Sequence, residues 1–128
     1  MYKYIKGSSD QDVRLMKTDE SDDEVWCDIL LGDQVVGDLS FIIDFPDADG
    51  YCYVERIDIL PEFRNRGIGT EVLKHTLYNT FGWQCRTVIV APDNADAQRL
   101  YERIGSEVIQ DTARIFGDFD QGYGVYEI

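Results

Sequence analysis

The hydrophobic residues change their spacing at Pro61, and this change restricts the chain to a fold that combines a sheet with helices. Before Pro61, apolar and polar residues alternate as they do in half-buried strands. The alternating segments are residues 12–17, 24–31, 35–43 and 51–60, with residues 2–6 as a further candidate strand. Gly32-Asp33-Gln34 lies between the second and third of the four and is typical of a hairpin turn.

After Pro61 the apolar residues follow a helical spacing. Residues 67–81 are predicted to form a helix that ends at Gly82, with the apolar stripe Ile68, Val72, Leu73, Leu77 and Phe81. Residues 87–90 are a short β-branched run without alternation, which indicates a buried central strand. A second helix is predicted from a cap at Asp93 or Asn94 to Gly105, with the stripe Ala97, Leu100, Tyr101 and Ile104. Residues 106–110 and 123–128 complete a mixed sheet with helices packed on it.

Length and charge narrow the class of protein. The chain has 128 residues without a repeat or a linker, so we expect a single domain over residues 1–128. No apolar stretch approaches the length of a membrane span or of a signal peptide, so we expect a cytoplasmic protein without a membrane partner. Acidic residues number 25 against 12 basic ones, for a net charge of −13. This charge disfavours nucleic acid and favours a cationic small molecule or a basic peptide.

The metal-ligating residues do not form a motif. Cys27, Cys52 and Cys85 lie far apart in the sequence, without a C-x-x-C pair or a neighbouring His. We expect them to be small core residues, and we expect no metal site. His75 lies in the middle of the first predicted helix and is interpreted as a surface or boundary residue.

The segment most informative about function is residues 57–70, Ile-Asp-Ile-Leu-Pro-Glu-Phe-Arg-Asn-Arg-Gly-Ile-Gly-Thr. Here a strand ends, a loop with Arg64 and Arg66 follows, and a helix begins. The amides of the first helical turn have no partner within the helix and favour an anion such as a pyrophosphate. An ordinary strand-to-helix turn is the alternative. No Gly-Lys-Ser/Thr follows the glycines, which excludes a Walker loop. A Rossmann fingerprint is excluded as well, because Thr70 occupies the approximate place of its third glycine.

Arg64-x-x-Gly67-x-Gly69, after a strand that ends in Ile59-x-Pro61, resembles the acetyl-CoA loop of the GNAT superfamily of N-acetyltransferases. Asn94-x-x-Ala97-x-x-Leu100-Tyr101-x-x-x-Gly105 resembles the later motif of the same superfamily. The resemblance covers about residues 51–105. It implies an α/β (α+β) fold with a mixed, mostly antiparallel central sheet of about six or seven strands and two main helices packed on it.

The resemblance also implies site residues. The pyrophosphate of acetyl-CoA would rest on the amides of residues 66–70, pantetheine would lie along residues 57–60, and Asn94 would hydrogen-bond the pantetheine amides. The implied donor-binding residues are Ile57, Ile59, Leu60, Arg64, Arg66, Gly67, Ile68, Gly69, Thr70, Asn94 and Ala97. Tyr101 would protonate the departing thiolate; the alternative is a half-buried core tyrosine.

Glu55 is the candidate for the general base, which must free the amine of its proton before the amine can attack. Strand alternation predicts that Tyr51, Tyr53, Glu55, Ile57 and Ile59 share one face, with Glu55 as its only carboxylate. The alternative is that Glu55 pairs with a neighbouring cation and stabilises the sheet. We leave both open.

The chain departs from the family before residue 25. Most members place one or two helices between their first two strands, whereas residues 17–24 are polar and are interpreted here as a loop, so that the first-half helices are reduced or missing. The acceptor side is then open to a peptide or protein lysine, or is completed by a second subunit. Asp-rich residues 44–49 and 118–120 form either an anionic rim or solvated turns.

The sequence therefore predicts an enzyme that moves an acetyl group from acetyl-CoA directly to a primary amine. Candidate acceptors are a small cationic amine and a protein or peptide lysine or N-terminus. The alternative function is a non-catalytic domain that binds acyl-CoA for regulation or interaction.

Overall fold

The computed structural model describes residues 12–43, 50–92, 95–108 and 125–128. These residues form a seven-stranded sheet of order β1-β2-β3-β4-β5-β7-β6. The strands are β1 (Val13–Glu20), β2 (Glu24–Leu31), β3 (Gln34–Ile42), β4 (Tyr51–Ile59), β5 (Thr87–Val90), β6 (Ser106–Val108) and β7 (Val125–Glu127). Neighbouring strands are antiparallel except β4 and β5, which are parallel. The predicted mixed, mostly antiparallel sheet is confirmed.

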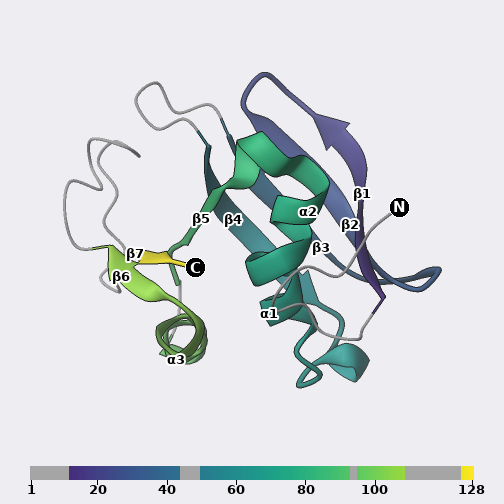
Figure 1. The fold of residues 1–128 in the computed structure, drawn as a ribbon. Coiled ribbons are helices and arrows are strands. Elements are labelled where there is room, and N and C mark those ends of the chain that lie inside the picture. The colour runs from purple at the N-terminus through teal and green to yellow at the C-terminus, as the bar shows by residue number, and fades with distance from the viewer. Residues whose placement is uncertain (1–11, 44–49, 93–94, 109–124) are drawn as a thin grey trace.

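The first predicted helix is a nearly continuous helical segment. It comprises α1 (Ile68–Glu71), a π-helical turn (Val72–Thr76) and α2 (Leu77–Phe81), and a 3-10 turn (Gly82–Cys85) follows. The segment lies over one face of β1–β4 (Figure 1). Its apolar stripe faces that sheet, and the rings of Phe81 and Phe41 meet edge to face with centroids 5.0 Å apart. His75 is half-buried in the π-helical turn, as expected of a boundary residue.

The second helix, α3 (Ala95–Ile104), packs beside β6 (Figure 1). The amide of Gly105 donates to the carbonyl of Tyr101 at its C-terminal end. The predicted cap at Asp93 or Asn94 lies outside the described residues, as do the candidate strand 2–6, the Asp-rich residues 44–49 and 118–120, and the predicted strand residues 109–110 and 123–124. None of the described helices is long and apolar enough to cross a membrane.

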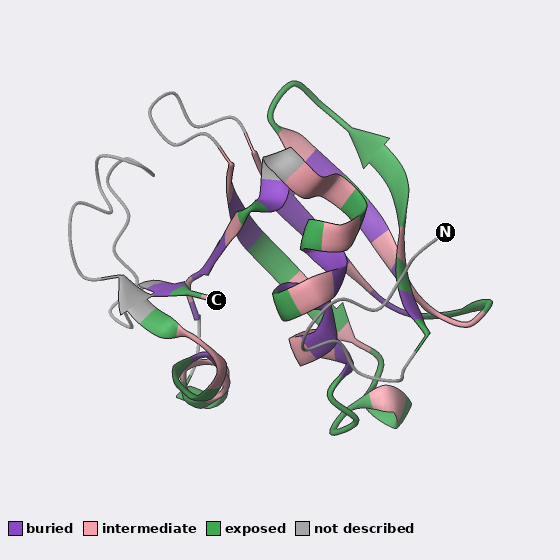
Figure 2. Cartoon of the chain, viewed as in Figure 1, coloured by how far each residue is buried: buried purple, intermediate pink, exposed green. Residues whose placement is uncertain are grey.

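The segment between the first two described strands is shorter than predicted. Residues 17–20, interpreted from the sequence as part of a loop, extend β1 to Glu20 and pair with β2. The amide of Ser21 then donates to the carbonyl of Glu24 at 2.8 Å in a tight turn. The polar residues of this segment fit an exposed strand end (Figure 2). Over residues 12–43 the structure has no helix, so the predicted loss of the first-half helices is confirmed for this part of the chain.

One buried cluster joins the sheet to its helices, and it contains all three cysteines as free thiols. Although distant in the sequence, the thiols lie together: that of Cys52 hydrogen-bonds that of Cys85, and Cys27 is close to both. Burial raises the pKa of Cys27 to about 12 and that of Cys52 well above its usual range. The thiols of Cys27 and Cys52 therefore stay protonated at neutral pH, and all three cysteines are buried core residues, as the sequence predicted.

Candidate active site

Strand β4 pairs with β5 over only the first half of its length. Residues 51–54 pair with β5, and the last pair is Val54 with Val90. Residues 56–59 pair with β3 alone. Their edge toward β5 has no partner strand among the described residues. Such an edge presents amide and carbonyl groups to which an extended ligand can add like another strand.

A β-bulge marks the point where the pairing with β5 ends. Ser40 pairs with Arg56 and Phe41 with Val54, so Glu55 is the extra residue. A bulge bends its strand and re-aims the side chains beyond it. The prediction that residues 51, 53, 55, 57 and 59 share one face is therefore wrong.

Beyond the bulge the faces of β4 are exchanged. Ile57 and Ile59 pack against the main core, whereas Tyr53 packs with Ile89 in a separate cluster on the other face. The side chain of Glu55 is exposed at the vertex where β4 and β5 part. The prediction from alternation failed here because it assumes that side chains change face at every residue along the strand, which a bulge interrupts.

The loop after β4 is held by the end of the strand itself. The amide of Leu60 donates to the carbonyl of Val36 at 2.8 Å, and a 3-10 turn (Pro61–Phe63) follows. The Nε of Arg64 donates to the carbonyl of Ile59 at 2.8 Å, and its Nη2 lies 3.4 Å from the carboxylate of Asp58. Arg64 thus fastens the loop to β4.

Gly67 joins this loop to the helical segment. Its φ of 79° lies in the left-handed region, where a Cβ is unfavourable, and α1 begins at the next residue. The amide of Glu71 donates back to the carbonyl of Gly67 at 2.9 Å. The amides of the first turn that precede Glu71 have no partner within the helix, and together with the helix dipole they favour an anion.

A cavity of about 570 Å³ lies between the open half of β4, this loop and α3. Most of the predicted donor-binding residues line it: Ile57, Ile59, Arg64, Gly67, Ile68, Gly69, Thr70 and Ala97. Leu60 and Arg66 are not among the lining residues: Leu60 is exposed, and the guanidinium of Arg66 lies 5.1 Å from the ring centroid of Phe63. Asn94 lies outside the described residues.

Six lining residues were missed by sequence reasoning: Asp58, Phe63, Asn65, Asp96, Leu100 and Arg103. Leu100 and Arg103 follow Asp96 and Ala97 at helical spacing, so the face that contains Ala97 could have indicated them. Arg64 and Arg103 bring positive charge to a cavity in an otherwise acidic chain. The carboxylates Asp58 and Asp96 line the same cavity.

Tyr101 is buried one helical turn beyond Ala97. Only 8% of it is exposed, and it belongs to the main core cluster together with Val90 and Tyr126. It does not line the cavity. These observations match the reading of Tyr101 as a core tyrosine, and its role as a proton donor stays a prediction.

Glu55 has a carboxyl partner that the sequence did not reveal. The side chain of Glu24, at the start of β2, forms a hydrogen bond with that of Glu55. This bond, burial, and repulsion from Glu55 and Asp23 together raise the pKa of Glu24 to about 7. Two interacting carboxyl groups therefore meet at the bulge, Glu55 from β4 and Glu24 from β2.

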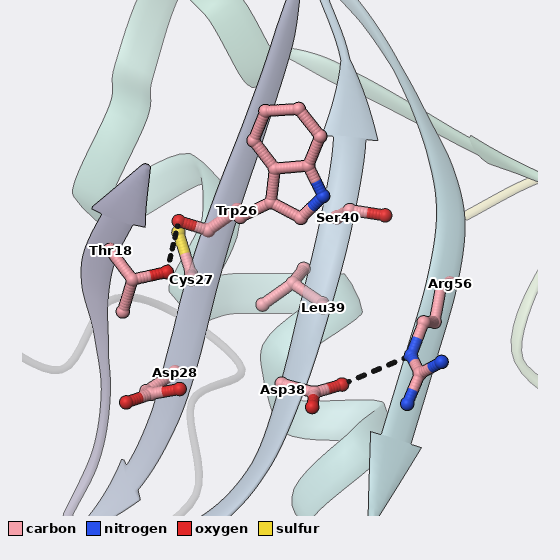
Figure 3. Close-up of a pocket in the computed structure, with 8 residues that line it drawn as sticks. All are labelled: Thr18, Trp26, Cys27, Asp28, Asp38, Leu39, Ser40 and Arg56. Atoms are coloured by element: carbon pink, nitrogen blue, oxygen red, sulfur yellow. Dashed lines mark hydrogen bonds and ion pairs between the residues drawn. The ribbon is translucent and has the colours of Figure 1, made fainter. Parts of the chain in front are cut away.

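A shallow groove of about 310 Å³ lies on the sheet face opposite the helical segment (Figure 3). The indole of Trp26 stands over it, 36% exposed, above Ser40 of β3. Arg56 closes its β4 side and pairs with Asp38 at 3.2 Å. Arg56 is the neighbour of Glu55, so the groove ends beside the vertex of β4 and β5.

An open strand edge, a glycine-bearing loop and a helix N-terminus around one cavity define a protein that binds an extended, anionic ligand. Residues 2–105 match the sequence family described as the acetyltransferase (GNAT) family, and the chain belongs to that family. The predicted family is confirmed, and it is a family of acetyltransferases. No curated protein matches the chain closely enough in sequence to be compared.

Solved structures support the same fold. An acetyltransferase from Thermus thermophilus has a TM-score of 0.59 at 17% identity, over 84% of this chain and 65% of its own. PaiA N-acetyltransferase from Thermoplasma acidophilum, in complex with coenzyme A, has a TM-score of 0.56 at 15% identity, over 82% and 60%. AAC(6')-Iy, in complex with the bisubstrate analogue CoA-S-monomethyl-acetylneamine, has a TM-score of 0.54 at 19% identity, over 72% and 67%. The chain thus spans about two thirds or less of the length of these proteins.

Proposed function

We propose that the protein is an N-acetyltransferase that moves the acetyl group of acetyl-CoA directly to a primary amine. The observation that carries this proposal is the cavity in which the unpaired half of β4 meets the loop at Gly67 and the start of α1. The proposal includes a cytoplasmic location. It extends the family assignment to a donor, an acceptor class and a mechanism.

The donor would lie along the cavity in an extended form. Its pyrophosphate would accept hydrogen bonds from the amides of residues 66–70. Its pantetheine would pair with the free edge of residues 57–60, and Asn94 would hold the pantetheine amides. The CoA bound to PaiA and the CoA analogue bound to AAC(6')-Iy support a CoA-derived donor for this fold.

The chemistry requires the acceptor nitrogen to lose two protons and the sulfur to gain one. Glu55, at the vertex, takes a proton from the ammonium of the acceptor, and the freed nitrogen lone pair attacks the thioester carbonyl. Backbone amides at the open edge stabilise the negative charge on the carbonyl oxygen. The carbon–sulfur bond then breaks, and Tyr101 gives its phenolic proton to the thiolate and takes up the second proton of the nitrogen as the neutral amide forms.

The acceptor would approach from the face opposite the helical segment. The groove at Trp26 ends beside the vertex, and the missing first-half helices leave that face open over the described residues. Asp28 and Asp38 line it, and Arg56 is already paired with Asp38 and Asp58. The aromatic ring and the excess of carboxylates favour a cationic amine, either a small one or the lysine or N-terminus of a peptide or protein.

One observation favours a second candidate function. Tyr101 is buried and does not line the cavity. A domain that binds acyl-CoA without transferring the acyl group requires the cavity but no proton donor at the sulfur. Turnover distinguishes this regulatory or interaction domain from an enzyme.

The test is release of free CoA thiol with a panel of primary amines, for the wild type and Tyr101→Phe. We expect kcat to fall at least about 100-fold in Tyr101→Phe, because the proton donor is lost, with little change in KM for acetyl-CoA. Tyr78→Phe, at a tyrosine that is 49% exposed on α2, is the matched control and should keep full activity. An equally active Tyr101→Phe would remove the residue from the mechanism, and binding without turnover of any amine would favour the regulatory domain.

A further inference from the structure

We propose that Glu24 is a positioning residue for the proton transfer: it shares a proton with Glu55, so that the two carboxyl groups act as one proton acceptor for the amine. The proposal rests on the N-acetyltransferase function proposed above. It assigns a role to the tight turn that replaces the first-half helices, because this turn brings Glu24 to the start of β2.

The backbone holds Glu24 firmly. Its carbonyl accepts from the amide of Ser21 at 2.8 Å, and its amide donates to the Ser21 hydroxyl at 3.3 Å. The carbonyl of Asp23, the preceding residue, accepts from the amide of Ile43 at 2.9 Å. The turn therefore fixes where the Glu24 side chain leaves β2.

Strand geometry places Glu24 on the face of the groove. Val25 is buried in the main core, so Glu24 and Trp26 project from the opposite face. Glu24 pairs with Ile42 of β3, and Ile42 pairs with Tyr53 of β4. The Glu24 carboxyl reaches Glu55 across β3, where the intervening side chain is apolar.

The charges around the pair are acidic. The described groups that act on the Glu24 carboxyl are Glu55 from β4 and Asp23 from the turn. On β1, Glu20 lies opposite Val25. Its carboxylate forms an ion pair with Lys17, with Oε1 2.6 Å from Nζ. On β4, the guanidinium of Arg56 pairs with Asp38 and Asp58. Each of these nearby cations thus already has a carboxylate partner of its own.

Two carboxyl groups that share a proton titrate as a pair. The raised pKa of Glu24, about 7, means that one proton stays between the two groups below neutral pH. Above that pH the pair has lost this proton, and the repulsion between the two negative charges favours the uptake of another. The pair then accepts a proton more readily than an isolated carboxylate, whose pKa is about 4.3.

The proton transfer itself involves both residues. An ammonium proton passes to a carboxylate oxygen of Glu55, and the electron pair of the broken N–H bond stays on the nitrogen for its attack. The new Glu55 hydroxyl donates a hydrogen bond to the Glu24 carboxylate. After the nitrogen has bonded to the acetyl carbon, the proton on the carboxyl pair leaves to solvent and the pair returns to its ionised form.

The experiment is the dependence of kcat on pH, with one amine, for the wild type, Glu24→Gln and the control Glu20→Gln. Glu20 is exposed on β1 and is not part of the proposed site. We expect kcat of the wild type to rise through about pH 7. In Glu24→Gln this rise of kcat with pH should move to lower pH by more than about one unit. The kcat reached above the rise should fall about tenfold, because an isolated carboxylate is a weaker base. Glu20→Gln should keep the wild-type profile, and an unchanged rise in Glu24→Gln would overturn the proposal.

An NMR titration of the glutamate side-chain carboxyl carbons tests the pair without turnover. The pair should titrate with one apparent pKa near 7 in the wild type, and this titration should be absent in Glu24→Gln. Separate titrations at ordinary pH values would overturn the pair whatever the activity. A coupled titration in a protein that acetylates no amine would instead overturn the proposed acetyltransferase function and, with it, the catalytic role of Glu24.

Discussion

The two halves of β4 differ in pairing, in burial and in the chemistry they permit. Residues 51–54 pair with β5, Tyr53 and Val54 pair with β3 as well, and Cys52, Tyr53 and Val54 are buried. Residues 56–59 pair with β3 only, and residues 55–59 are exposed or half-buried. The bulge at Glu55 separates the two halves. A single strand therefore serves as core at one end and as a binding edge at the other, and what changes between them is the loss of one neighbouring strand.

The substitution Gly37→Ala should disrupt the open half most severely. A Cβ at Gly37 would lie 2.2 Å from the carbonyl oxygen of Asp58, and backbone atoms of β4 cannot yield as a flexible side chain can. We expect a loss of unfolding free energy of about 3 kcal/mol, at the upper end of the range for overpacked sites. Urea denaturation measures it.

Gly69→Ala is the control for this prediction. A Cβ at Gly69 would have Ile59 as its nearest neighbour, at 4.0 Å, and would interrupt no backbone contact. This variant should be as stable as the wild type or up to about 1 kcal/mol more stable, since Ala favours a helix over Gly. Equal stability of the two variants would show that β3 and β4 are not so closely packed at Gly37.

The core beside residues 51–54, where Cys27 of β2 lies close to Cys52, should respond to alkaline pH with a smaller change in stability. Burial raises the pKa of Cys27 to about 12, whereas the thiol ionises near its ordinary pKa of 9.0 in the unfolded chain. The folded state thus keeps a proton that the unfolded state loses. The stability from this thiol is fully present below pH 9.0 and decreases as the pH rises toward 12.

The measurement compares the wild type with Cys27→Ala in urea at neutral pH and at about pH 11. Cys27→Ala lacks the titrating thiol, so its stability deficit relative to the wild type should shrink at the higher pH. Val36→Ala also shortens a buried β-sheet side chain without removing an ionisable group, and its deficit should stay constant. A constant deficit for Cys27→Ala as well would mean that water reaches the thiol.

Local patterns in the sequence predicted the loop, the helical segment and most of the cavity, because these depend on residues that are close in the chain. Gly67 and the stripe from Ile68 to Phe81 act within a few turns of backbone. The prediction of which β4 side chains share a face was wrong beyond the bulge, because Glu55 becomes an extra residue only through the register of β4 with β3. The pair Glu24–Glu55 and the thiol cluster were missed because strand pairing, not spacing, brings these residues together.

The most direct test of the proposed donor site is thermal unfolding with and without acetyl-CoA. At ~100 times its dissociation constant, the ligand should add about 2.7 kcal/mol to the stability of the wild type and raise Tm by several degrees. Gly69→Phe should abolish the shift, because its ring would fill the cavity beside Ile59. Lys74→Phe, which adds a ring at an exposed position of the same helical segment, should keep it. No shift in the wild type, or an equal shift in Gly69→Phe, would contradict a donor site between the open half of β4 and α1.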